Sequence, residues 1–173
     1  VIHTINIKSE SLENISKAVL HIINEQGLLR SVLIEESGKL LWREYGEIDK
    51  LDIPSVDLSV FEPTGFEHVI REIVKTVHGE DMNVSGAMFR IVHIKENNNE
   101  GKIVIAFNHI IFDGYCLSVF KTRLKQLLNP ARNYNKLEVK QYHEYVESIA
   151  KGPVDVTQDE LIYDLNLKEF ARS

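Results

Sequence analysis

The sequence predicts an α/β domain in which a mixed sheet is flanked by helices. Side chains alternate with a period of two over residues 1–8, which is typical of a strand. Residues 103–107 form an uninterrupted apolar run, which is typical of a strand that is buried on both faces and central in its sheet. Apolar residues recur at helical spacing in residues 12–23, 66–77 and 117–128, so helices are expected between and after the strands.

The first strand is followed by a helix and a hairpin. One apolar face predicts a helix that begins after Ser9 and ends near Gly27. That face consists of Leu12, Ile15, Val19, Ile22 and Ile23. Residues 30–36 and 39–44 then predict two short strands, and Ser37-Gly38 between them is typical of a hairpin turn.

The middle of the chain predicts a loop and a second helix. Residues 46–62 are expected to be irregular because Pro54 and several aspartates interrupt them. Thr64 and Glu67 have the spacing of a capping box, so we expect a helix to begin there. An apolar stripe continues this helix until Gly79.

The rest of the chain predicts two strands and up to three helices. Residues 88–95 and 102–108 form the strands, and the polar segment between them forms a loop. A helix then runs from about Tyr115 until Asn129-Pro130 stops it. Further helices are expected over residues 137–150 and within residues 157–173.

Composition excludes several classes of function. Twenty Lys and Arg residues against 26 Asp and Glu residues give a net charge of −6, so we expect no nucleic-acid partner. Cys116 is the only cysteine, which excludes an internal disulfide and a cysteine-based metal site. No histidine pair has zinc-binding spacing and no glycine-rich phosphate loop is present, so we expect no metal and no nucleotide cofactor. No apolar run approaches the about 20 residues of a membrane span, so we expect no membrane partner and a cytoplasmic location.

The strongest candidate for chemistry lies where the central strand gives way to the following helix. The segment reads Asn108-His109-Ile110-Ile111-Phe112-Asp113-Gly114. Side chains at such a junction face the space beyond the strand end, a common place for sites in α/β proteins. A neutral imidazole there can accept a proton near neutral pH, because its reference pKa is about 6.5. Asp113 lies about one helical turn from His109, too far round to orient the ring, and Gly114 permits a tight turn.

A purely structural interpretation of these residues stands beside the catalytic one. His109 would then be a core histidine that is hydrogen-bonded to a carbonyl group, and Asp113 would cap the next helix. The residues of this segment alone leave both interpretations open.

Together with segments elsewhere in the chain, this motif makes the sequence resemble the condensation domains of nonribosomal peptide synthetases, within the chloramphenicol-acetyltransferase-like superfamily. The family marker is His-His-x-x-x-Asp-Gly at the end of a strand, and Asn108 stands here in place of the first histidine. Three other family segments have counterparts in the family order. They are Leu29-Arg30-Ser31 for Leu-Arg-Thr, Gly86-Ala87-Met88-Phe89-Arg90 for Gly-Pro-Leu-x-Arg, and Tyr142-His143-Glu144-Tyr145 for Tyr-x-Asp-Tyr. A second departure is Glu25-Gln26-Gly27, where the family has Arg-His-Glu.

The resemblance implies a role for each residue of the marker. His109 is implied to be the catalytic residue that positions or deprotonates an attacking amine. Asp113 is implied to turn away from the substrate and to form a structural ion pair with Arg30. Asn108 and Gly114 are implied to support the site, although an asparagine cannot act as a base. Backbone N–H groups at the start of the following helix are our candidates for stabilising the oxyanion.

The resemblance also implies the partners. Substrates in the family are carried on the phosphopantetheine of peptidyl or aminoacyl carrier proteins, so no cofactor is expected to bind the chain directly. Residues 1–152 resemble the N-terminal lobe of a two-lobed domain, and residues 153–173 would be a linker or tail toward a second lobe. Because the first strand starts at Val1 with no polar lead-in, we also expect residues to precede it. The sequence thus describes half of an active site, and we expect the isolated lobe to be inactive.

Three functions remain open from the sequence. The first is an amide-forming condensation lobe, which the motif His109-x-x-x-Asp113-Gly114 favours. The second is a non-catalytic docking or scaffold lobe, which Asn108 and the missing half favour. The third is an acyltransferase relative that uses an acyl-CoA donor. In each case the missing lobe should leave an apolar face, so we expect docking to that lobe or self-association.

Overall fold

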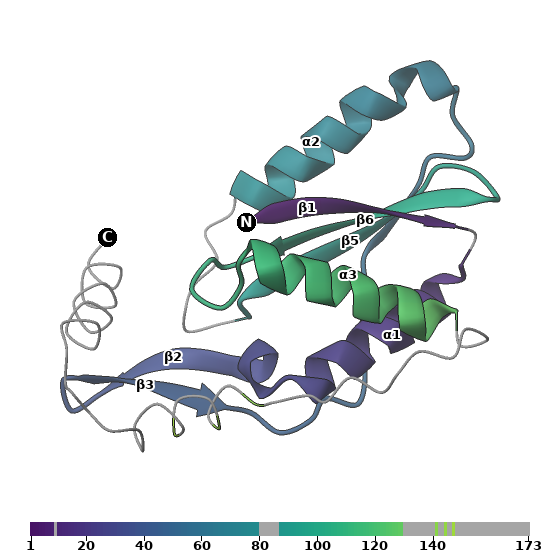
Figure 1. Ribbon diagram of the computed structural model, residues 1–173. Helices are drawn as coiled ribbons and strands as arrows, with labels where there is room; N and C mark the ends of the chain where they lie inside the picture. The colour runs from purple at the N-terminus through teal and green to yellow at the C-terminus, as the bar shows by residue number, and fades with distance from the viewer. Residues whose placement is uncertain (9, 80–86, 130–140, 142–143, 145–146, 148–173) are drawn as a thin grey trace. The chain divides into compact units, whose positions relative to one another are not determined.

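The computed structural model describes residues 1–8, 10–79 and 87–129, together with residues 141, 144 and 147. The chain divides into two units, Val1–Val139 and Lys140–Ser173. All of the helices and strands named below belong to the first unit. Strands and helices are mixed along this unit, which confirms the α/β class (Figure 1).

A four-stranded mixed sheet forms the centre of the first unit, with the strand order β1-β6-β5-β4. The strands are β1 (Ile2–Lys8), β6 (Glu100–Phe107), β5 (Phe89–Lys95) and β4 (Ser55–Asp57). β6 pairs antiparallel with both β1 and β5, whereas β4 pairs parallel with β5. The predicted central position of residues 103–107 is therefore confirmed.

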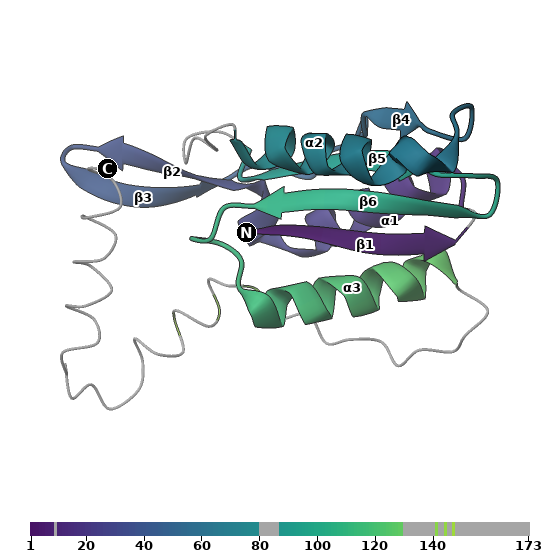
Figure 2. The same ribbon diagram turned by 90° about the horizontal axis from the view of Figure 1, so that it is seen from above.

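Alternating side chains of β6 divide the core into two layers. The helices are α1 (Leu12–Glu25), α2 (Phe66–Gly79) and α3 (Gly114–Leu128). Ile103, Ile105 and Phe107 point to the face that α1 and α3 cover. Val104 and Ala106 point to the opposite face, which α2 covers (Figures 1 and 2). None of these five side chains is more than 1% exposed, so β6 is buried on both faces as predicted.

An ion pair ties α1 to α3 on the face that they share. Arg123 Nε donates to Glu25 Oε2 at 2.9 Å, and Arg123 Nη2 contacts the other carboxylate oxygen. Burial opposes ionisation of the Glu25 carboxyl, but the hydrogen bond and charge of Arg123 outweigh it, so the pKa of Glu25 is lowered. Glu25 opens the segment that departs from the family pattern, and its side chain here links two helices.

A separate two-stranded sheet follows α1. It is formed by β2 (Ser31–Glu36) and β3 (Lys39–Glu44), which pair antiparallel, and the short 3-10 helix η1 (Gly27–Arg30) joins it to α1. The connecting Ser37 and Gly38 have positive φ angles of 54° and 75°. Positive φ at both central positions is typical of the type I′ turn, so the predicted hairpin is confirmed.

Two details of the fold differ from the prediction. Residues 46–62 are not wholly irregular, because β4 adds a short strand at the sheet edge. Three residues are too few to show a period in the sequence. Thr64 does not cap α2, because it lies in the 3-10 turn η2 (Pro63–Gly65) and the helix begins at Phe66. The predicted end of this helix at Gly79 is confirmed.

Some predictions fall outside the described residues. These are the helices over residues 137–150 and 157–173, the linker 153–173, most of the Tyr142-His143-Glu144-Tyr145 segment, and Gly86. Within the described part of the chain, no helix combines the length and the apolar character needed to cross a membrane.

His93 fastens the short strand β4 to the sheet. Its backbone N–H donates to Pro54 O at 2.9 Å, and its Nδ1 lies 2.7 Å from Ser55 Oγ. The residue is only 6% exposed. Burial lowers the pKa of His93 from its ordinary value of 6.5, against the opposing charge of Asp57 and together with that of Lys95.

We expect the free energy of unfolding to fall as the pH drops below about 6.5. Since the pKa of His93 is lower in the folded state, the unfolded chain takes up the proton first, and acid favours unfolding. Above about pH 6.5 the His93 ring is neutral in both the folded and the unfolded chain, so it does not reduce the free energy of unfolding there. Urea unfolding at about pH 7.5 and about pH 5.5 measures the difference, which His93→Gln should reduce.

His3 can contribute to the same acid sensitivity, because burial, Lys121 and the N-terminal charge also lower its pKa. A His3→Gln variant therefore measures the part of the effect that does not come from His93. The two variants should each remove part of the acid sensitivity. An acid sensitivity that His93→Gln leaves unchanged would contradict the assigned burial of this ring.

Candidate active site

The loop between β6 and α3 is held by backbone hydrogen bonds. Asn108 N–H donates to Met88 O at 2.8 Å, and Phe107 N–H donates to Val1 O at 2.7 Å. Within the loop, Ile111 N–H donates to Asn108 O at 3.2 Å. The loop therefore leaves the sheet from a fixed position between β5 and β1.

Two apolar side chains anchor the middle of this loop. Ile111 and Phe112 are each 6% exposed. The ring of Phe112 stacks on Phe107, with centroids 3.6 Å apart and planes 4° apart, and lies edge-on to Phe120 of α3. Because these side chains are buried, the polar residues on either side of them are left at the surface.

His109 is one of these surface residues. Its side chain is exposed and makes no hydrogen bond or ion pair with the described residues. The structural interpretation, in which His109 is a core histidine bonded to a carbonyl, is therefore wrong. No described residue covers the imidazole, so it is accessible to an approaching group.

Asn108 shapes the turn on which His109 stands. Its side-chain Oδ1 accepts a hydrogen bond from Ile110 N–H at 3.0 Å, and the side chain is half-buried. This is an Asx turn, in which the side chain copies a backbone turn. The asparagine that replaces the first histidine of the marker thus has a structural contact within the loop.

Asp113 caps α3. Its Oδ1 accepts a hydrogen bond from Cys116 N–H at 2.8 Å, and this bond is the main cause of the lowered pKa of Asp113. A hydrogen bond from Tyr115 N–H lowers the pKa further. These N–H groups were the predicted oxyanion donors. The Asp113 carboxylate occupies the Cys116 N–H, so this group is not free to stabilise an oxyanion, and for the other N–H groups the role stays a prediction.

The predicted ion pair between Asp113 and Arg30 is also wrong. Arg30 Nη2 instead donates to Glu44 Oε1 at 2.8 Å, and the Arg30 side chain is only 10% exposed. Among the described residues, Arg30 Nε and Nη1 are buried without a hydrogen-bond partner. Asp113 is exposed at the start of α3, where its carboxylate stabilises the helix end.

The hairpin register explains why Glu44 was missed. Glu44 lies opposite Ser31 in the β2–β3 pair, and Tyr45 N–H donates to Arg30 O at 3.0 Å. Glu44 therefore arrives beside Arg30 at the end of the hairpin. Pairing residues outward from the Ser37-Gly38 turn is the signal that identifies this partner from the sequence.

Gly114 is the first residue of α3 and has open space around it. A side-chain Cβ built there would meet no atom of the described chain within 4 Å, and its φ is not positive. The turn therefore does not require glycine, although glycine permits it as expected. The open space leaves room for an approaching chain beside the marker.

We expect Asp113→Asn to change the free energy of unfolding by less than about 0.5 kcal/mol, because asparagine caps helices as well as aspartate does. Glu44→Gln is the matched variant. It removes the negative charge beside the mostly buried Arg30 but leaves an acceptor oxygen, and because Glu44 is half exposed it should cost about 1 kcal/mol. Urea unfolding of both variants tests this order, and a larger loss in Asp113→Asn would restore the predicted pair.

Gly114→Ala should leave the fold intact and raise the free energy of unfolding by about 0.4–1 kcal/mol. Alanine restricts the unfolded chain, and the folded structure accommodates its Cβ. Thermal unfolding measures the change. A destabilised variant would show that the backbone at this position needs glycine after all.

Solved structures with the same fold include several condensation domains. The starter condensation domain of rhizomide synthetase RzmA aligns with a TM-score of 0.77 and 16% identity, over 92% of this chain and 41% of that chain. A solved chain concerned with condensation domain-mediated chain release from the enacyloxin polyketide synthase has a TM-score of 0.75 and 18% identity, over 88% of this chain and 31% of that chain. The SgcC5 protein from Streptomyces globisporus has a TM-score of 0.75 and 16% identity, over 88% and 36%. The present chain thus spans 31 to 41% of these solved chains.

At such identities these likenesses show the fold alone, and they confirm the predicted chloramphenicol-acetyltransferase-like architecture. No curated protein sequence matches the chain. The family model of the Condensation domain matches residues 4–159, which is most of the sequence. The chain therefore belongs to the Condensation domain family.

Proposed function

We propose that this chain is the N-terminal lobe of a condensation domain that joins an acyl group to an amine, with both substrates held as thioesters on carrier proteins. The observation that carries the proposal is the exposed His109 on a loop whose apolar residues are anchored in the core. Membership of the Condensation domain family supplies the class of reaction. The short span of the chain relative to its solved relatives supports a lobe rather than a whole domain.

His109 would supply the base or the positioning group of this reaction. The amine nitrogen attacks the thioester carbonyl, a C–N bond forms, and the C–S bond breaks to release the thiol of the donor carrier. The amine must lose a proton as it attacks, and a neutral imidazole can accept that proton. The proton then leaves with the departing sulfur, so the reaction needs no external oxidant or reductant.

The negative charge that develops on the carbonyl oxygen needs donors from elsewhere. The Cys116 N–H at the start of α3 donates to Asp113, so it is not free to stabilise this charge. We assign that role to the second lobe, which would form the other wall of the site. Because the base and the oxyanion donors would come from different lobes, one lobe alone should be inactive.

The other marker residues would act through the loop. Asn108 shapes the turn beneath His109, and Asp113 fixes the start of α3. The open space beside Gly114 would admit the phosphopantetheine arm of a carrier protein. Arg30 would stabilise the junction between η1 and the hairpin through Glu44, at a distance from the chemistry.

One observation favours a second candidate, a docking or scaffold lobe without catalysis. The Asn108 side chain accepts a hydrogen bond from the loop itself, and an asparagine cannot replace a histidine as a base. A scaffold lobe would keep the fold and the anchored loop but would not depend on His109.

The test of the proposal uses the full-length gene product that contains this sequence, together with two loaded carrier proteins. We expect native protein to form the amide and His109→Ala to reduce the rate at least about 100-fold, the usual contribution of a general base. The 173-residue chain alone should form no measurable product, since it forfeits orientation effects worth up to about 7–11 kcal/mol. Product is measured by mass spectrometry after release from the carrier.

The matched control is His68→Ala, which removes an exposed histidine on α2. It should leave the rate unchanged, and neither substitution should change stability by more than about 0.5 kcal/mol. Full activity of His109→Ala would overturn the proposed role. A gene product without a second lobe would favour the scaffold function, and turnover with an acyl-CoA in place of the donor carrier would favour the acyl-CoA-dependent function.

A further inference from the structure

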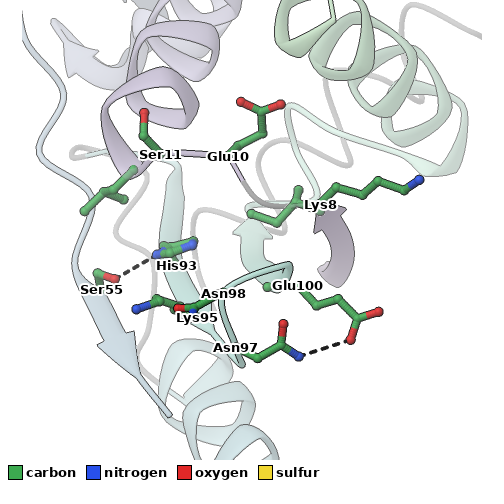
Figure 3. Close-up of a pocket in the computed structure, with 12 residues that line it drawn as sticks. Lys8, Glu10, Ser11, Ser55, His93, Lys95, Asn97, Asn98 and Glu100 are labelled. Atoms are coloured by element: carbon green, nitrogen blue, oxygen red, sulfur yellow. Dashed lines mark hydrogen bonds between the residues drawn. The ribbon is translucent and has the colours of Figure 1, made fainter. Parts of the chain in front are cut away.

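A second polar site lies at the other end of the sheet from His109. A pocket of about 250 Å³ is formed where β1 ends, α1 begins and β5 turns into β6 (Figure 3). Its walls include the apolar Ile7 and Leu12 and the polar Ser55 and His93. His109 follows Phe107 at the opposite end of β6, whereas His93 pairs with Ile103, four residues or about 13 Å before that end at the usual rise of about 3.3 Å per residue. His109 does not line the pocket. The pocket is therefore separate from the condensation marker.

A hydroxyl and an imidazole meet in this pocket. Ser55 Oγ lies 2.7 Å from His93 Nδ1, and the two residues are paired across β4 and β5 (Figure 3). Ser55 is exposed on the edge strand, whereas His93 is nine-tenths buried or more. The nucleophile candidate is thus accessible while its partner is held rigidly.

We propose that Ser55 is a nucleophile and His93 its base, and that the pair gives this chain a second activity, the hydrolysis of small acyl thioesters. Ser55 Oγ attacks the thioester carbonyl while His93 Nδ1 takes the hydroxyl proton. The C–S bond breaks, the proton passes to the leaving thiolate, and an ester forms on Ser55. Water then attacks this ester with His93 again as base, which releases the carboxylic acid and restores the hydroxyl.

The charges around His93 suit a base of this kind. Burial lowers the pKa of His93, so the ring is neutral and able to accept a proton at neutral pH. The charge of Asp57 acts in the opposite direction and stabilises the imidazolium that forms during attack. Hydrogen bonds from Ser59 and Lys95 hold the pKa of Asp57 at about 2, so this carboxylate remains charged. Lys95 is ion-paired with Asp57 at 2.9 Å and acts against it on His93, so Asp57 supplies only part of the stabilisation that a triad carboxylate gives.

The far edge of the ring is kept open by a glycine. A Cβ at Gly101 would lie 2.7 Å from Ile94 O and 3.5 Å from His93 Nε2. The close contact with a backbone oxygen excludes a side chain at this position, so Nε2 is not covered from this side. The ring must carry its proton on Nε2 for Nδ1 to act as the base.

The start of α1 lies on the rim of the same pocket. Ser11 is the N-cap, and its Oγ accepts a hydrogen bond from Asn14 N–H. This bond occupies the Asn14 N–H, just as Asp113 occupies the Cys116 N–H of α3, so only the N–H groups of Leu12 and Glu13 are left without a partner within the helix. The helix dipole is positive at this end. A negative charge on a thioester oxygen in the pocket would be stabilised by these two N–H groups and by the dipole. Ile7 and Leu12 provide an apolar wall for a short acyl chain.

The experiment labels the 173-residue chain with diisopropyl fluorophosphate and follows the intact mass and the modified peptide. The phosphorus bonds to the serine oxygen, fluoride leaves, and His93 takes the proton. We expect one adduct, on Ser55, and no adduct in Ser55→Ala. Labelling should be at least 10-fold slower in His93→Gln, since glutamine can accept a hydrogen bond but is not a base at neutral pH.

Ser59 is an exposed serine of the same edge whose hydroxyl contacts the carboxylate of Asp57, and it serves as the comparison for selective labelling. Ser118→Ala, which removes an exposed serine hydroxyl on α3 outside the pocket, is the matched control. It should be labelled on Ser55 at the native rate. Release of thiol from a short acyl thioester should follow the same order among the variants. Circular dichroism confirms that each variant is folded, and Ser55→Ala, which alters an exposed residue, keeps the test valid if His93→Gln unfolds. No adduct on Ser55, equal labelling of Ser55 and Ser59, or equal rates in folded His93→Gln and native protein would overturn the proposal.

Discussion

Burial of β6 on both faces is the constraint on which the other elements depend. Its odd-numbered residues meet α1 and α3, and its even-numbered residues meet α2, so each helix needs β6 in one register. A shift by one residue would move Ile105 to the wrong layer and bring Val104 in its place. The antiparallel neighbours β1 and β5 form hydrogen bonds with the backbone N–H and C=O groups of β6 on both sides, so this strand can lie in the interior.

The position of the candidate site follows from this register. Phe107 is the last residue of β6 and points to the α1 and α3 face, where Phe112 stacks on it. The stack returns the chain to the core at Phe112, and His109 lies in the short segment between the two rings. The imidazole is therefore exposed because Phe107 and Phe112, before and after it, are buried. No hydrogen bond to the described residues fixes its ring.

The sequence predicted elements with a clear period and missed contacts that depend on distant residues. The runs over residues 12–23 and 103–107 identified a helix and the inner strand, because a buried face repeats in the sequence. β4 was missed since its position depends on pairing with β5 rather than on a pattern of its own. The partner of Arg30 was taken from the family pattern, yet the hairpin places Glu44 beside it, and Asp113 satisfies the helix end instead. A carboxylate can cap a nearby helix or pair with a distant cation, and the Asp113 carboxylate caps α3.

Two imidazoles near β6 lie in opposite environments, His93 buried beside the middle of the strand and His109 exposed beyond its last residue. The environment decides how much of a site each one can form alone. His93 has its hydroxyl partner, a nearby carboxylate and a helix start among the described residues, so the proposed hydrolysis would need only a substrate. His109 has a fixed position but no polar partner among the described residues, and the nearest helix start donates to Asp113. A base without oxyanion donors stabilises only one of the two charges that develop during acyl transfer. The proposed condensation site at His109 would therefore need donors from outside the described residues, whereas the proposed site at His93 draws on groups of this chain alone.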